Sequence, residues 1–171
     1  MAITKSTIIV EDKLKSLFDY LPLFAINSFS YKPIFMYGDE IELNQFFKSK
    51  NNEDIPYPLI WLVYPYVEQH NYSRVKIDKL DFVLAINTNA VMLNDERIEV
   101  SYKPLLIPLL DNIRELFRKA NIIIVKDNSY IITKFPNYSD SDKNKVVDRW
   151  DALKVSLGCT IYDDILKPIV Y

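Results

Sequence analysis

Glycine, histidine and cysteine are the residues that this sequence has least of. Its 171 residues include two glycines, Gly38 and Gly158, one histidine, His70, and one cysteine, Cys159. A phosphate-binding loop needs several glycines within a few residues, so Walker A loops and Rossmann fingerprints are excluded. Zinc sites use several Cys or His ligands, and a disulfide needs two cysteines. We therefore expect no metal, no cofactor and no disulfide within the chain.

The chain also lacks long apolar runs and a charge excess of either sign. No apolar stretch approaches the roughly 20 residues of a membrane span, and the first residues carry no signal-peptide pattern. We therefore expect a protein that is made in a cytosol and has no membrane partner. The 21 Lys and Arg against 23 Asp and Glu give a net charge of -2, whereas nucleic-acid-binding proteins carry a strongly basic face. The length predicts a single domain over residues 1–171.

Two shorter segments carry helical signals. Apolar positions at helical spacing predict an amphipathic helix over residues 7–21. Asp39 followed by Glu42 is the pattern of a capping box, which predicts the start of a short helix over residues 40–48.

The main helix is expected within residues 101–121, where apolar residues repeat at three and four. Pro104 can lie in its first turn, and Pro108 then either costs one hydrogen bond or marks the true start. A polar loop is expected before it, up to residue 99.

Five apolar runs predict strands. Residues 59–63 lie between prolines and read as a strand buried on both faces, at the centre of the sheet. Residues 80–86 and 153–162 alternate apolar and polar side chains. Residues 122–125 and 130–135 flank four polar residues, which predicts a hairpin. The resulting fold class is α+β, with a mostly antiparallel sheet of about four or five strands packed with a long helix and an N-terminal helix.

The residues that could carry chemistry have simpler interpretations. Cys159 and His70 would need to be in contact to act as nucleophile and base, and we interpret Cys159 as a small core residue and His70 as a solvated loop residue. Asp78 and Asp81 are the kind of paired carboxylates that glycosidases and magnesium sites use. Both lie among lysines, however, which favours a solvated face.

Aromatic residues point instead to contacts with other proteins. Trp150 follows Arg149 just before the last predicted strand, and Trp and Arg are enriched in interface hot spots. A Trp that anchors its own core fits this segment equally well. The chain also contains 12 tyrosines, many of them expected in loops or at strand ends, and Tyr is enriched where proteins meet proteins.

Several stretches of the sequence resemble a known protein family. An N-terminal amphipathic helix is followed by YPLIWLVYP, KLDFVLAINT, ERIEVSYKPLLIPLLDNIRELF and DRWDALKVSLGCTIYDDI. These stretches resemble neck proteins of tailed bacteriophages that infect Bacteroides-type gut bacteria, crAss-like phages among them. The order of the elements is similar to the tail terminator, or tail completion, fold. The resemblance covers roughly residues 5–165 and includes no catalytic motif.

The resemblance implies a structural virion protein of the phage neck or tail and not an enzyme. Such a protein is made in the bacterial host cytoplasm and forms a homo-oligomeric ring, a hexamer or dodecamer, that joins or terminates the tail at the portal vertex. Its partners would be further copies of itself, the portal and other neck and tail proteins. DNA would pass through the lumen without specific binding, which a near-neutral charge permits.

In that family the sheet and its extended loops make the subunit contacts, which here implies residues 66–79 and 88–100. Together with the tyrosines and the segment around Trp150, this gives a set of candidate contact residues: Tyr66, Tyr72, Arg74, Lys76, Arg97, Tyr102, Arg149 and Trp150. The alternative is a non-enzymatic cytosolic adaptor or small-ligand-binding domain whose polar sheet face receives a peptide or a metabolite. A hydrolase that uses Asp78 and Asp81 ranks last.

Overall fold

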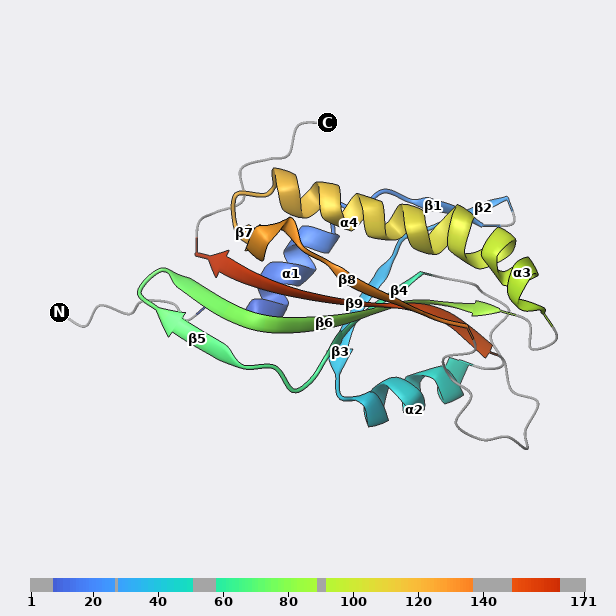
Figure 1. The fold of residues 1–171 in the computed structure, drawn as a ribbon, viewed down its shortest axis with the longest axis horizontal. Helices are drawn as coiled ribbons and strands as arrows, with labels where there is room; N and C mark the ends of the chain where they lie inside the picture. The colour runs from blue at the N-terminus through green and yellow to red at the C-terminus, as the bar shows by residue number, and fades with distance from the viewer. Residues whose placement is uncertain (1–7, 27, 51–57, 89–91, 137–148, 164–171) are drawn as a thin grey trace.

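A seven-stranded sheet forms the middle of the computed structural model, with helices on both of its faces (Figure 1). The structure describes residues 8–26, 28–50, 58–88, 92–136 and 149–163. The helical segments are α1 (Val10–Phe18), α2 (Glu40–Lys50), α3 (Asn94–Arg97), the π-helical η1 (Ile98–Leu106), α4 (Ile107–Lys119) and the short 3-10 turn η2 (Lys126–Asn128).

The strand order of the main sheet is β3-β4-β6-β9-β7, with β5 beside β6 and β8 beside β9. Only β3 and β4 run parallel to each other; the other pairs are antiparallel. A separate hairpin, β1 (Phe24–Ile26) and β2 (Phe29–Tyr31), precedes the sheet. The main strands are β3 (Ile34–Gly38), β4 (Leu59–Val63), β5 (Glu68–Asn71), β6 (Arg74–Thr88), β7 (Ile123–Val125), β8 (Ile131–Phe135) and β9 (Arg149–Tyr162).

The predicted class, α+β with a mostly antiparallel sheet, is confirmed, but the predicted strand count of four or five is too low. β3 and β5 were not predicted because neither shows a clear alternation of apolar and polar residues. β5 reads Glu-Gln-His-Asn and is held by backbone pairing to β6 at the sheet edge, so it needs no apolar face. The predicted strands over residues 59–63 and 153–162 are present, and the second begins four residues earlier, at Arg149.

Two predictions about sheet order are wrong. β4 is buried on both faces, as predicted, but the centre of the sheet is formed by β6 and β9. β7 and β8 do not form a hairpin with each other, because both pair with β9, one after the other along its length. The turn between them has positive φ at Asp127 and Asn128 and shifts the chain along β9 instead of reversing it onto β7.

The main helix begins earlier than predicted. α3, η1 and α4 follow one another without a break from Asn94, so the expected loop up to residue 99 is partly helical. In η1 the backbone is wider than an α-helix, and the N–H of Ile107 donates to the carbonyl of Tyr102, five residues earlier. This wider segment contains Pro104, and Pro108 follows it in the first turn of α4. Because η1 precedes α4 without a break, Pro108 does not mark the start of the helix, and its missing N–H costs one hydrogen bond to the preceding turn.

The capping box at the start of α2 is confirmed. The N–H of Glu42 donates to Asp39 Oδ1 at 2.8 Å, and the N–H of Asp39 donates to Glu42 Oε2 at 3.1 Å. The predicted N-terminal helix is present as α1, and residue 7 of the predicted range lies outside the described residues. Both helices therefore lie where the sequence pattern placed them.

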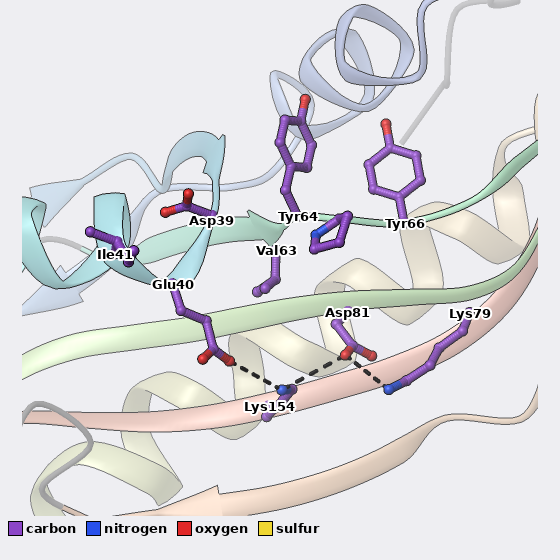
Figure 2. A pocket seen from close by; sticks show the side chains of 10 residues that line it. Asp39, Glu40, Ile41, Val63, Tyr64, Tyr66, Lys79, Asp81 and Lys154 are labelled. Carbon is purple, nitrogen blue, oxygen red and sulfur yellow. Dashed lines mark ion pairs between the residues drawn. The ribbon is translucent and has the colours of Figure 1, made fainter.

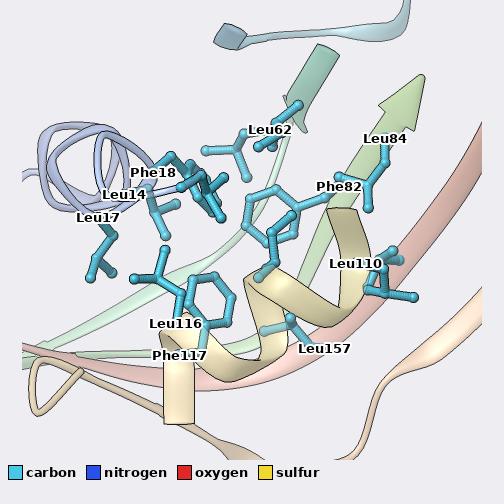
Figure 3. Packing of buried hydrophobic residues seen from close by; sticks show 14 of the residues in the cluster. Leu14, Leu17, Phe18, Leu62, Phe82, Leu84, Leu110, Leu116, Phe117 and Leu157 are labelled. Carbon is cyan, nitrogen blue, oxygen red and sulfur yellow. The ribbon is translucent and has the colours of Figure 1, made fainter. Parts of the chain in front are cut away.

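The two faces of the sheet carry two separate cores. Figure 3 shows the larger core, in which α1 and α4 pack against the sheet and the ring of Phe18 lies 5.8 Å from that of Phe117. The smaller core lies under α2 on the opposite face, where Phe47 stacks on Trp150 at 4.5 Å. Since α2 is short, its core covers only the part of that face near β4 and the start of β9.

Candidate functional site

The sheet face opposite α4 becomes polar beyond the start of α2. Along β9 the side chains of Lys154, Ser156 and Thr160 are partly exposed there, while the alternate residues of the strand are buried in the larger core. The sequence predicted this division of β9 into a core face and a face for water or a partner, and the structure confirms it. Two hollows open on the polar face.

The first hollow, the cleft, has a volume of about 440 Å³ and lies between the start of α2 and the segment that leaves β4 (Figure 2). Its floor is formed by β6 and β9. The residues that line it are Asp39, Glu40, Ile41, Val63, Tyr64, Pro65, Tyr66, Lys79, Asp81 and Lys154.

A chain of ion pairs crosses the floor of the cleft. Lys154 Nζ lies 3.7 Å from Asp81 Oδ2 and 3.8 Å from Glu40 Oε1, and Lys79 Nζ lies 3.3 Å from Asp81 Oδ2. Ser156 also donates its hydroxyl proton to Asp81 Oδ1. The side chain of Asp81 is 15% exposed, whereas that of Glu40 is 62% exposed and reaches into solvent at the mouth.

A bulge in β6 helps to shape this floor. The register between β6 and β9 shifts between Ile77 and Leu80, so Asp78 and Lys79 lie in the irregular part of the strand. Gly158 on β9 allows the close approach, because a Cβ at that position would lie 2.9 Å from the carbonyl oxygen of Asp78. A bulge of this kind redirects side chains. Here Lys79, which lies in the bulge, forms an ion pair with Asp81 in the floor of the cleft.

The wall formed by Tyr64 and Tyr66 is anchored from behind. Both hydroxyl groups donate to the same oxygen of Glu11 on α1, and Figure 2 shows them pointing away from the ion pairs. Burial raises the pKa of both tyrosines, and their bonds to Glu11 raise it further. Burial alone would raise the pKa of Glu11, but the two hydrogen bonds outweigh burial and lower it. No spacing pattern in the sequence relates Glu11 to these tyrosines.

The second hollow, of about 330 Å³, lies on the β5–β6 hairpin. Its lining residues are Gln69, His70, Asn71, Arg74, Lys76 and Thr160. The hairpin turns at Tyr72, whose side chain is 85% exposed. Lys76 Nζ is paired with Asp78 at 2.9 Å, whereas Arg74 has no ion-pair partner among the residues that the structure describes.

The hairpin brings together three of the predicted contact residues, Tyr72, Arg74 and Lys76. Tyr66 lies just before β5 and is half-buried against α1. For Arg149, which opens β9, the side chain lies outside the described residues, as do residues 89–91 of the second predicted contact segment.

The other three predicted contact residues are buried inside the chain, which corrects their expected place on the surface. Arg97 is fully buried, with Nη1 at 2.8 Å from Asp151 Oδ1. The hydroxyl of Tyr102 donates to the carbonyl of Ala152 at 3.3 Å. Trp150 packs in the smaller core, which is the alternative expected for this residue from the sequence. Arg97 and Trp150 are buried because the helical segment and β9 begin earlier than the sequence pattern indicates. Tyr102 lies within the predicted helix range and is buried because its side chain reaches β9.

The remaining candidate residues do not assemble into a nucleophile and base. Cys159 is buried in the larger core, and burial raises the pKa of its thiol to about 12. His70 is exposed, although it lies in β5 and not in a loop, and its ring contacts Glu68. Asp78 is an exposed surface residue, as predicted, whereas Asp81 lies in the cleft floor. Among the described residues, no group of three or more His, Cys, Asp or Glu could hold a metal ion.

No family model matches this chain, and no curated protein matches it either. None of the helices in the described parts of the chain is both long and apolar enough to cross a membrane. Function is therefore inferred from the hairpin, from the cleft and from the resemblance of the sequence.

Proposed function

We propose that this protein is a structural subunit of a phage neck or tail, which assembles into a homo-oligomeric ring that joins or terminates the tail at the portal vertex. The observation that carries the proposal is the β5–β6 hairpin. Its inner side is fixed, because Val75 and Ile77 are buried in the larger core, while its tip presents Tyr72 and Arg74 to solvent. A rigid, exposed aromatic and basic tip is suited to bind another protein with little loss of conformational entropy.

Such a subunit is not an enzyme, and it acts within the virion by holding neighbours in place. Its partners are further copies of the same chain, the portal and other neck and tail proteins. DNA moves through the lumen without specific contacts, because a chain with a net charge of -2 does not release many counterions from the phosphate backbone.

The test is the native mass of the purified protein, measured by sedimentation velocity over a concentration series. The protein is first run alone and then mixed with candidate portal and tail proteins. We expect a closed oligomer in one of these samples, such as a hexamer or dodecamer. A stable monomer in every sample, which binds none of those proteins, would contradict the proposal.

The cleft favours a second candidate function, a cytosolic adaptor or small-ligand-binding domain. Its volume of about 440 Å³ lies within the range of pockets that hold small ligands. A monomer whose melting temperature rises with a peptide or metabolite, and whose response is lost in Lys154→Met, would support this function instead of the ring.

A further inference from the structure

We infer that the cleft receives the tip of the β5–β6 hairpin from a neighbouring copy of the chain, with Arg74 of that copy paired to Glu40 at the mouth of the cleft. This inference rests on the proposed ring function, and it names the two surfaces that would make the ring.

The hairpin supplies a cation, Arg74, at its tip. Of the charged residues on the hairpin, Glu68 contacts His70 and Lys76 is paired with Asp78, whereas Arg74 has no ion-pair partner among the described residues. An arginine guanidinium binds a carboxylate with two parallel hydrogen bonds. A carboxylate on another protein surface is therefore the group that Arg74 would bind most strongly.

The cleft supplies the matching carboxylates. Asp39, Glu40 and Asp81 line it against two lysines, so its lining carries a net charge of -1. Asp81 is held by both lysines and by Ser156, and it has little capacity left for a further cation. Glu40 is 62% exposed and its lysine contact is long, at 3.8 Å, so its carboxylate is accessible. Asp39 is exposed as well, but its Oδ1 accepts the N–H of Glu42 in the capping box.

The mouth of the cleft also offers an apolar surface for Tyr72. Ile41, on the first turn of α2, is 68% exposed, and Pro65 on the opposite wall is exposed as well. Tyr72 is 85% exposed and Arg74 is exposed as well, and Tyr and Arg are residue types enriched in interface hot spots. The hairpin tip and the cleft are therefore matched in both charge and apolar character.

The two surfaces cannot meet within one chain. Arg74 and Asp81 are seven residues apart on β6, which is about 23 Å along an extended strand. The contact therefore has to join two copies through different surfaces. A head-to-tail contact of this type repeats from copy to copy and gives a ring when the rotation closes.

The test uses charge reversal at both surfaces. In Arg74→Glu a carboxylate of one copy meets Glu40 of the next, and in Glu40→Lys a lysine meets Arg74. We expect each variant alone to assemble about tenfold more weakly or worse, because facing like charges oppose association. A one-to-one mixture of the two variants restores a favourable pair at every contact, so it should assemble nearly as well as the natural chain.

Two matched controls separate this pairing from a general effect of charge. Lys15→Glu reverses an exposed cation on α1, and Asp12→Lys reverses an acid in the first turn of a helix, as Glu40→Lys does. Neither control should change assembly, and circular dichroism should show that all four variants are folded.

The outcomes are distinct for the inference and for the proposed function. If the natural chain assembles and Arg74→Glu and Glu40→Lys assemble equally well, the hairpin and cleft are not the contact, although the ring function stands. If each variant alone fails and the mixture fails too, the direct pairing is wrong. If the natural chain does not assemble alone or with its candidate partners, the ring function fails first.

Discussion

Replacing Arg97 by methionine should lower the free energy of unfolding by about 3–5 kcal/mol, the cost of removing one member of a buried ion pair. Arg97 is 0% exposed. Its Nη1 lies 2.8 Å from Asp151 Oδ1 and 2.9 Å from Thr88 Oγ1, and its Nε donates to the carbonyl of Met92 at 3.1 Å. Methionine retains the apolar stem but donates none of these bonds, so a buried carboxylate loses its cation.

The measurement is urea denaturation followed by the fluorescence of the two buried tryptophans, Trp61 and Trp150. A domain of this kind is stable by about 5–15 kcal/mol, so the variant should remain measurable at low temperature. Arg118→Met is the matched control, because Arg118 pairs with Glu115 on the exposed side of α4 and surface pairs contribute little.

The double variant Arg97→Met with Asp151→Leu tests the physical reason. It removes both charges, so it should be less destabilised than the sum of the two single variants, as expected for a coupled pair. A loss below about 1 kcal/mol for Arg97→Met, or strict additivity of the two changes, would refute the idea that this pair joins the start of the long helix to β9.

Three further results are expected. Gly158→Ala should destabilise the protein by about 1–3 kcal/mol in the same urea assay, because its Cβ would lie 2.9 Å from a carbonyl oxygen of the β6 bulge. The thiol of Cys159 should fail to react with Ellman's reagent in the native protein and react fully in urea, since it is buried and its pKa is raised to about 12. The folded-state pKa of Glu11 is lowered from 4.5, so the stability that it contributes is present above pH 4.5 and is lost as pH falls through the lowered pKa. In a pH series of thermal melts, the melting temperature of the natural chain should therefore fall as pH drops below 4.5. The double variant Tyr64→Phe with Tyr66→Phe should lose this contribution to the fall, and an unchanged dependence of its melting temperature on pH would contradict the role of Glu11.

Local patterns predicted the elements whose own residues determine them. The alternation in β9 identified that strand because one of its faces is buried along its whole length. The capping box of Asp39 and Glu42 identified the start of α2, because both partners lie within one turn. The sequence did not predict β3 and β5, because edge strands are held by backbone hydrogen bonds to a neighbouring strand and do not need a regular apolar face.

The candidate site was predicted only in part, for a related reason. Tyr72, Arg74 and Lys76 were named from the resemblance, and they are neighbours in the chain. The cleft joins Glu40 with Lys154, which are more than a hundred residues apart, and no local pattern relates such positions. Arg97 was expected in a surface contact because it lies in the polar segment 88–100, and no local pattern indicates its buried partner Asp151, which follows 54 residues later.

The place of β9 in the sheet has a consequence for how the chain is made. β9 pairs with β6, β7 and β8, yet among the strands that the structure describes it is the last to be synthesised. Tyr162 follows Thr88 by 74 residues, which a ribosome adding about 5–20 residues per second translates in about 4–15 s. During that interval the backbone N–H and C=O groups of β6 that later pair with β9 have no partner strand, so chaperones or other nascent chains can bind them. The arrival of β9 then closes this edge of β6.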